Sequence, residues 1–310
     1  DFQSAITSTR RAVADYDQLA ASASLTRFTS DSPFAQFVFT PRTTLLSTVD
    51  RLNNAANTMQ TQTAALIDAM ETSFANDFRT DGGHWMVQVD DPAAINELVS
   101  RYGKQRSYQT LQEHLDDLKS LYNLEQRVRQ QVADAIAAVH AGETNAAQIA
   151  VPPEAGAMDA AGWMGTAQSV ASTLGVQVKQ TSVYGCPGAD DNGDDNADMV
   201  IGFFCGGSQA SRNEVNMLTT HPEWPAVERS PLLVDYTKHE LAHRSIMIVC
   251  GTTEPEIAAN RTEAVTNSYA VQFLGASRER IAGSQQGLAA YAMDAQSDQI
   301  AQSIHNGTCA

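Results

Sequence analysis

The sequence has few basic residues, few cysteines and no long apolar run. Its 310 residues include 20 Lys and Arg against 36 Asp and Glu, which gives a formal net charge of −16 at pH 7. A charge of this sign argues against binding to nucleic acid or to an anionic membrane surface. No stretch reaches about 18 consecutive apolar residues, so no segment is predicted to span a bilayer. A hydrophobic content of 43% is enough for one large core or two smaller ones.

The four cysteines all lie in the C-terminal half, and none belongs to a Cys-x-x-Cys pair. Their even number favours two disulfides. Of the three pairings, we prefer Cys186–Cys205, which closes a short loop, and Cys250–Cys309, which ties the chain end to the body. Four free thiols in a cytosolic protein are the alternative. A cysteine one residue from the terminus suits a disulfide better than a buried thiol, so we expect an extracytoplasmic location.

The sequence begins at Asp1 rather than at a methionine. We therefore expect that a signal peptide or an N-terminal anchor has been removed. The protein is then either secreted or held at the cell surface by a membrane anchor upstream of residue 1.

Residues 1–150 are poor in glycine and show helical periodicity. Apolar and small residues recur at spacings of three and four over residues 2–20 and 45–70, as in a heptad seam. The second helix is expected to end at residues 81–83, which read Asp-Gly-Gly, and a third helical face contains Leu118 and Tyr122. The pattern predicts an antiparallel helical bundle or coiled-coil hairpin, a stalk that we expect to bind a partner protein.

Three histidines of this half, His84, His114 and His140, follow no metal-binding pattern. We expect them to be solvated or core residues. The segment 142–156 contains Val151-Pro152-Pro153 and is predicted to link this domain to a second one over residues 151–310.

The second domain is predicted to mix helices with a short sheet, so the whole chain is expected to be α-rich α+β. We expect a helix over residues 159–174, strands over 176–184 and 199–205, an irregular stretch around residue 221, and helices over 231–249, 258–274 and 288–304.

The helix over residues 231–249 contains His239-Glu240-x-x-His243. Residues four apart share a helix face, so both imidazoles can reach one zinc ion, with Glu240 beside them. Zinc bound in this way retains an open position for a water molecule, whose proton the glutamate can accept and pass to a leaving amine. Two surface histidines without a metal are the alternative.

A catalytic zinc needs a third protein ligand, and no histidine follows until His305. Glu254, Glu256 and Glu263 are the candidates. Glu263 is preferred, because a turn after Cys250 would lay its helix against the zinc helix, whereas the other two flank Pro255 near the helix end.

His239-Glu240-x-x-His243 followed by Glu263-Ala264 resembles the zinc signature of gluzincin metallopeptidases. The resemblance covers residues 151–310 and implies a small zincin-like domain with a short sheet and an active-site helix. It also implies a glutamate ligand from a second helix and a protein or peptide substrate bound antiparallel to an edge strand.

The chain departs from this family at Asn267, where many members have an aspartate that orients a zinc-binding histidine. An amide can still accept a hydrogen bond, but without charge it raises ligand basicity less. The family's transition-state donor is a tyrosine or histidine on a later element, for which Tyr269, Tyr291 and His305 are candidates.

An acidic segment follows the first predicted strand. Oxygen-bearing side chains alternate along it, as in calcium loops, although an EF-hand would need glycine at Asp195 and glutamate at Ile201. A calcium turn of another kind and a flexible acidic hairpin tip remain the two interpretations. The proposed Ca²⁺ ligands are Asp190, Asn192, Asp194, Asn196 and Asp198.

These features lead to a secreted or surface-anchored zinc endopeptidase as the first hypothesis. The alternative is a non-catalytic scaffold or adhesion protein with a degenerate zincin domain, which the amide at Asn267 favours. A third hypothesis is a peptidase whose helical half is an inhibitory pro-region.

Overall fold

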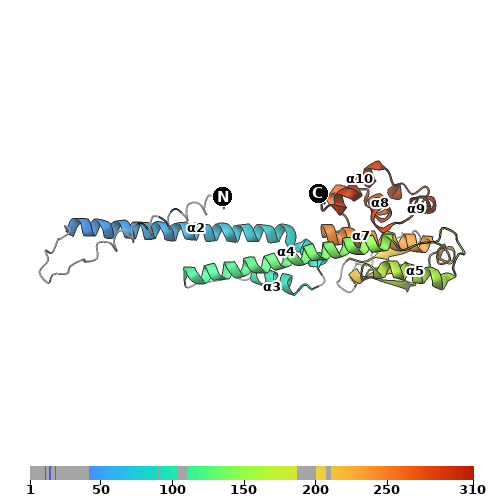
Figure 1. The fold of residues 1–310 in the computed structure, drawn as a ribbon, viewed down its shortest axis with the longest axis horizontal. Coiled ribbons are helices and arrows are strands. Elements are labelled where there is room, and N and C mark those ends of the chain that lie inside the picture. The colour runs from blue at the N-terminus through green and yellow to red at the C-terminus, as the bar shows by residue number, and fades with distance from the viewer. Residues whose placement is uncertain are drawn as a thin grey trace. The chain divides into compact units, whose positions relative to one another are not determined.

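Helices predominate in the described part of the protein, and the strands there form one small sheet (Figure 1). The computed structural model describes residues 42–89, 91–102, 110–186, 200–206 and 211–310, together with residues 11, 14 and 18. The prediction of an α-rich α+β protein is confirmed. The predicted seam over residues 2–20 and the proposed calcium ligands at 190–198 lie outside the described residues.

Contacts between Cα atoms divide the chain into two compact units. The N-terminal unit comprises residues 1–80 and 98–125, and the C-terminal unit comprises residues 81–97 and 126–310. The division into a domain at 1–150 and a domain at 151–310, each folding by itself, stays a prediction. Residues 126–150 nevertheless belong to the C-terminal unit.

Three helices supply the described core of the N-terminal unit: α2 (Arg42–Gln88), α3 (Ala93–Tyr102) and α4 (Leu111–Ala147). Leu118 is buried as predicted, but Tyr122 is 46% exposed. The face that packs is therefore set by Leu121 and Leu124 rather than by Tyr122. The buried apolar residues of this unit are Ile67, Phe74, Leu98, Leu118, Leu121 and Leu124.

The predicted end of α2 at Asp81-Gly82-Gly83 is wrong, because the helix continues to Gln88. Its last turns belong to the C-terminal unit, where Trp85 is 4% exposed. The side-chain amide of Gln88 donates to the carbonyls of Ile248, at 3.0 Å, and Val249, at 3.2 Å. These contacts outweigh the poor helix propensity of the two glycines.

The sheet of the C-terminal unit contains β1 (Gln177–Thr181), β2 (Gly202–Phe204) and β3 (Glu214–Leu218), in the order β1-β3-β2. β1 is parallel to β3 and β2 is antiparallel to it. The prediction that the segment before residue 221 is irregular is therefore wrong for β3, the central strand. Pairing on both sides stabilises this short segment, and its own propensity gives little sign of that.

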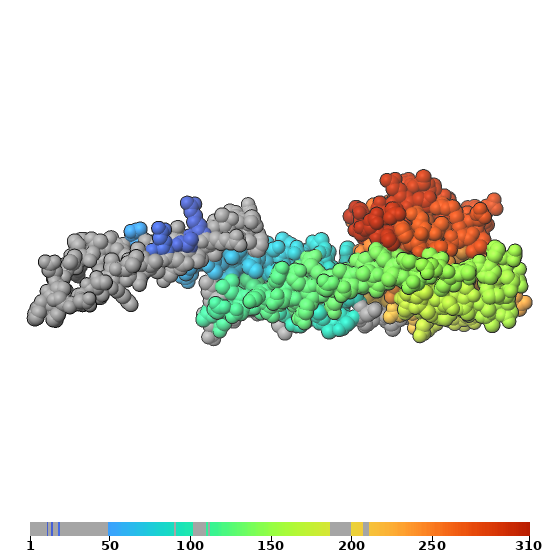
Figure 2. Space-filling view, viewed as in Figure 1, coloured from blue at the N-terminus to red at the C-terminus, as the bar shows by residue number. Residues whose placement is uncertain are grey.

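Helix α7 (Leu232–Cys250) is buried on nearly all sides, since Leu232 and His243 alone among its 19 residues are not fully buried. It contacts β2, α5 (Ala160–Ser172), α8 (Thr262–Leu274), α9 (Arg278–Ser284) and α10 (Ala295–His305). Figure 1 shows α5 on one side of α7 and α8 to α10 on the other. In Figure 2 the C-terminal helices, coloured orange to red, form a lobe over the green and yellow segments that hold the end of α4 and α5.

Gly251 ends α7 in a left-handed conformation, with φ of 73°. A Cβ atom there would lie 2.2 Å from Cβ of His84, so both the backbone angle and the packing require glycine. The minor elements of the unit are α6 (Trp224–Val227), η2 (Ser211–Asn213), η3 (Glu256–Ala258) and η4 (Ala289–Tyr291).

Both predicted disulfides are confirmed. Cys186 is bonded to Cys205, and Cys250 is bonded to Cys309. Such bonds form in an oxidising compartment, so the structure supports that part of the location prediction. Among the described helices, none combines the length and apolar character that crossing a membrane requires.

Candidate metal centre

His239, His243 and Glu263 converge in the C-terminal unit. One carboxylate oxygen of Glu263, Oε2, lies 3.1 Å from Nε2 of His239 and 3.4 Å from Nε2 of His243. One ligand atom from each residue lies within 4.8 Å of the other two. The structure thus brings together the three residues predicted to bind zinc.

Two packed helices create this convergence. His239 and His243 lie one turn apart on α7, so their side chains leave the same face, and their rings meet edge to face at 4.8 Å. Glu263 lies in the first turn of α8, which packs against α7 after the chain turns at Gly251. By contrast, Glu254 and Glu256 are exposed and belong to no potential metal-binding group.

Asn267 orients the first histidine. Its amide oxygen lies 2.7 Å from Nδ1 of His239. Its amide nitrogen donates to Oε1 of Gln285 at 2.7 Å and to the backbone carbonyl of Tyr291 at 2.9 Å. A backbone carbonyl can only accept, so the amide oxygen must face His239 and receive the proton of Nδ1. Nε2 of His239 then faces Glu263 and is the ring nitrogen available to a metal ion.

The charges around this point favour a cation. Burial lowers the pKa of His239, but its contact with Glu263 and the nearby carboxylates raise the pKa to about 9. Burial opposes ionisation of Glu263, yet the two histidine contacts hold its pKa well below the ordinary range. The three side chains therefore stabilise positive charge where they meet. Glu263 is the most exposed of the three side chains, at 31%, against 14% for His243 and 7% for His239.

Glu240 lies between the metal cluster and strand β2. Its side chain accepts the backbone N–H of Phe204, and burial raises the pKa of its carboxyl, against the lowering effect of His239 and His243. A Cβ atom on Gly202 would lie 3.2 Å from both Cγ and Oε1 of Glu240. A side chain at residue 202 would therefore press on this glutamate, and glycine leaves it in place.

Of the three candidates for the transition-state donor, Tyr291 is the one that lies beside the proposed zinc ligands. Its ring is 6.1 Å from that of His239, and burial, followed by the charges of Glu263 and Glu240, raises the pKa of its hydroxyl well above the ordinary value. It also lines a cavity of about 460 Å³, together with Gln285, Leu288 and Met293. Tyr269 and His305 lie elsewhere and contact Glu143 instead.

Sequence reasoning missed the residues that support the centre from α9 and the loop after it. Asp235, fully buried on α7, is paired with Arg280 at 2.5 Å and accepts the backbone N–H of Ser277 at 2.9 Å. These bonds fix α9 on α7, and α9 ends next to Gln285, the partner of Asn267. The sequence signal for them is an acidic residue, Asp235, one turn before His239 on the same helix.

Comparisons with protein-family models, with curated proteins and with solved structures gave no match to the chain.

Proposed function

We propose that the C-terminal unit is a zincin-like zinc endopeptidase that hydrolyses peptide bonds. The observation that carries the proposal is the convergence of His239, His243 and Glu263 beside the buried carboxylate of Glu240. Two nitrogen ligands and one carboxylate are a set that catalytic zinc sites use, with the remaining position left for water.

The residues fit a zinc ion on two further counts. Oε2 of Glu263 is buried, and no hydrogen bond satisfies it within the described part of the chain. In addition, Nδ1 of His239 is already bonded to Asn267, which leaves Nε2 for a metal. Asn267 therefore performs the orienting role through its amide oxygen, which weakens the case for a degenerate, non-catalytic domain.

When bound here, zinc would supply Lewis acidity, which activates water and polarises the peptide carbonyl. The carboxylate of Glu240 then accepts a proton from the attacking water and delivers it to the leaving amine nitrogen. The water oxygen forms the new bond to the carbonyl carbon as the C–N bond breaks. The hydroxyl of Tyr291 donates a hydrogen bond to the carbonyl oxygen as charge develops on it.

The substrate is proposed to be an extended peptide that lies along β2. This strand is at the end of the order β1-β3-β2 among the described residues, and Glu240 packs against it. An edge strand offers unpaired backbone groups that an extended peptide can bind. The helices of the N-terminal half are proposed to form a hairpin stalk that binds a partner protein or recruits the substrate.

The two disulfides and the proposed activity suit a secreted or surface-anchored protein. A Ca²⁺ ion at Asp190, Asn192, Asp194, Asn196 and Asp198 stays a prediction, since these residues lie outside the described part.

The test uses the full chain loaded with zinc and a library of unstructured peptides, with new termini identified by mass spectrometry. Wild-type protein should cut a defined subset of peptides, whereas Glu240→Gln should cut none above background while still binding zinc. Glu256→Gln, which changes an exposed glutamate outside the cluster, should cut like wild type. Equal cleavage by wild type and Glu240→Gln would refute the assigned role.

A further inference from the structure

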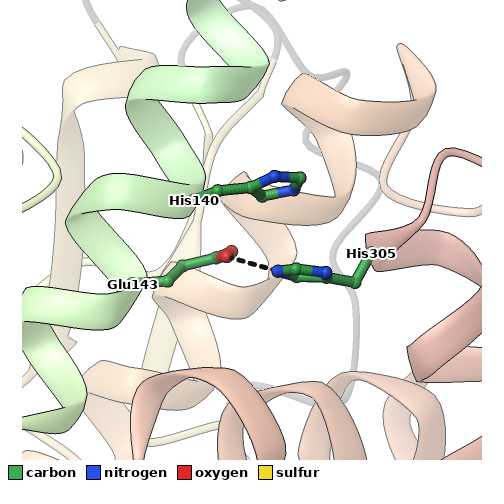
Figure 3. Close-up of side chains that lie close together, drawn as sticks. All are labelled: His140, Glu143 and His305. Carbon is green, nitrogen blue, oxygen red and sulfur yellow. Dashed lines mark ion pairs between the residues drawn. The ribbon is translucent and has the colours of Figure 1, made fainter.

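A second cluster of metal-ligand side chains lies in the C-terminal unit, away from His239 and His243. Figure 3 shows His140 and Glu143 extending from α4 and His305 from α10 toward the same space. The two imidazoles stack, with ring centroids 4.0 Å apart and planes inclined by 19°. Nε2 of His305 lies 3.2 Å from Oε2 of Glu143. One ligand atom from each of the three residues lies within 4.8 Å of the other two.

The hydroxyl of Tyr269 positions the carboxylate of Glu143. Glu143 is 1% exposed, and the hydroxyl of Tyr269 donates to Oε1 at 2.8 Å. The other oxygen, Oε2, is buried and makes the ion-pair contact with His305, but no hydrogen bond satisfies it within the described residues. By bonding to Oε1, Tyr269 fixes the carboxylate of Glu143 with Oε2 on the side of the histidines. Metal-binding carboxylates are commonly oriented by such a hydrogen bond.

One of the two histidines is also incompletely satisfied. Nε2 of His140 is buried and lacks a hydrogen-bond partner among the described residues. The ring of His305 is stacked between His140 and Phe273, whose centroid lies 3.9 Å away. A buried carboxylate oxygen and a buried imidazole nitrogen without partners are costly, so a group that binds both would stabilise this packing.

We infer that His140, Glu143 and His305 form a second zinc site, which is structural rather than catalytic. His140 and Glu143 are three residues apart on α4 and share a face, so one ion can reach both. Binding requires the stacked rings to turn, so that the three atoms, now within 4.8 Å of one another, close to the separation of roughly 3.3 Å expected between ligands of tetrahedral zinc.

The donor set selects the class of metal. Two imidazoles and one carboxylate suit zinc or a similar divalent transition metal, whereas Ca²⁺ and Mg²⁺ need mostly oxygen ligands. The one carboxylate of this cluster, Glu143, is itself a proposed ligand, whereas Glu240, the base proposed for the first site, lies outside the metal-binding group of that site. A bound ion would therefore join α4 to α10 without taking part in hydrolysis.

The test measures zinc per chain after dialysis of the purified full-length protein against dilute zinc. Wild type should hold two ions. His305→Ala should hold one, and so should His243→Ala, which removes a ligand of the first site. The variant with both substitutions should hold none. His114→Ala, a control at a histidine that contacts Glu71, should still hold two.

A single ion in wild type that is unaffected by His305→Ala would overturn the second site and leave the first intact. Conversely, a single ion lost in His305→Ala but kept in His243→Ala would support this site and refute the proposed catalytic one. Because His305→Ala could also unfold the region, a second measurement uses a variant with this cluster intact. In crystals of His243→Ala, anomalous diffraction at the zinc edge should give a peak among His140, Glu143 and His305, and no peak there would overturn the inference.

Discussion

The amide oxygen of Asn267 lies 2.7 Å from Nδ1 of His239, and the amide nitrogen is bonded to Gln285 and to the carbonyl of Tyr291. The amide oxygen of Asn267 therefore contacts the histidine, and the amide nitrogen contacts two hydrogen-bond acceptors. An aspartate, which many gluzincins have at this position, would present an oxygen to the Tyr291 carbonyl. The surroundings of Asn267 thus favour an amide over a carboxylate. The amide lacks the negative charge of an aspartate, but it donates a hydrogen bond to the Tyr291 carbonyl that an ionised aspartate could not donate.

The first prediction follows from this bond. Asn267→Asp should lower the free energy of unfolding by about 1–3 kcal/mol, because at a buried position it places a carboxylate oxygen against the Tyr291 carbonyl, which then lacks a donor. Chemical denaturation measures the change. The control Asn57→Asp alters an exposed residue and should stay within about 0.5 kcal/mol of wild type. A more stable Asn267→Asp protein would show that the orientation assigned to the amide is wrong.

The second prediction concerns the glutamate ligand. Glu263→Gln should weaken zinc binding at the catalytic site by about 10- to 100-fold or more, since a neutral amide replaces the only anionic ligand. Competition with a zinc-binding dye gives the affinity. Glu254→Gln, at an exposed glutamate outside the cluster, should bind zinc like wild type. Equal affinities of the two variants would exclude Glu263 as a ligand.

The third prediction uses the close approach of β2 to Glu240. Gly202→Ala places a methyl group about 3.2 Å from Cγ and Oε1 of that glutamate, so the carboxylate must shift by a few tenths of an ångström. We expect kcat to fall by about tenfold or more while zinc content is unchanged, because proton transfer depends on the position of the base. Gly165→Ala, where a Cβ would meet nothing within 4 Å, is the matched control. Unchanged kcat in Gly202→Ala would place the base elsewhere.

The fourth prediction concerns Tyr291. Tyr291→Phe should lower kcat by about 10²- to 10³-fold, with zinc content unchanged, because one donor to the developing oxyanion is lost. Steady-state kinetics on a peptide found in the library separate kcat from KM. Tyr269→Phe, which removes a hydroxyl that is bonded to Glu143, should leave kcat near the wild-type value. If both variants retain full activity, another group must stabilise the transition state.

The fifth prediction concerns the Cys250–Cys309 disulfide. Replacing both cysteines by serine should lower the free energy of unfolding by about 2–4 kcal/mol, because the bond closes a long loop with a sequence separation of 59. Denaturation with and without a reductant measures the effect. The reductant should destabilise wild type more than the variant, and an identical response of the two would argue that the bond does not contribute.

Local patterns explain which parts of the structure the sequence predicts. The spacing of His239 and His243 on a helix fixes their shared face, and the glycine at 251 predicts the helix end that lets α8 fold back with Glu263. The disulfides follow from the number and positions of the cysteines. Each of these features depends on neighbours in the sequence or on simple counting.

Features set by distant contacts were not predictable in this way. Strand β3 is stabilised by β1 and β2 on either side, and α2 passes Gly82 and Gly83 because Gln88 bonds to the end of α7. His140 and His305 lie far apart in the sequence, so their stacking follows only from the packing of α4 and α10. The spacing of His140 and Glu143 is the one local sign of that cluster.

The most direct measurement is a zinc titration of the metal-stripped full chain, with hydrolysis of a library-derived peptide as the readout. Activity should be absent without zinc and rise to a plateau as the site formed by His239, His243 and Glu263 fills. His243→Ala should stay inactive over the same range. Hydrolysis that persists after metal removal, or no hydrolysis by wild type at any zinc concentration, would contradict the proposal that this centre is a zinc peptidase site.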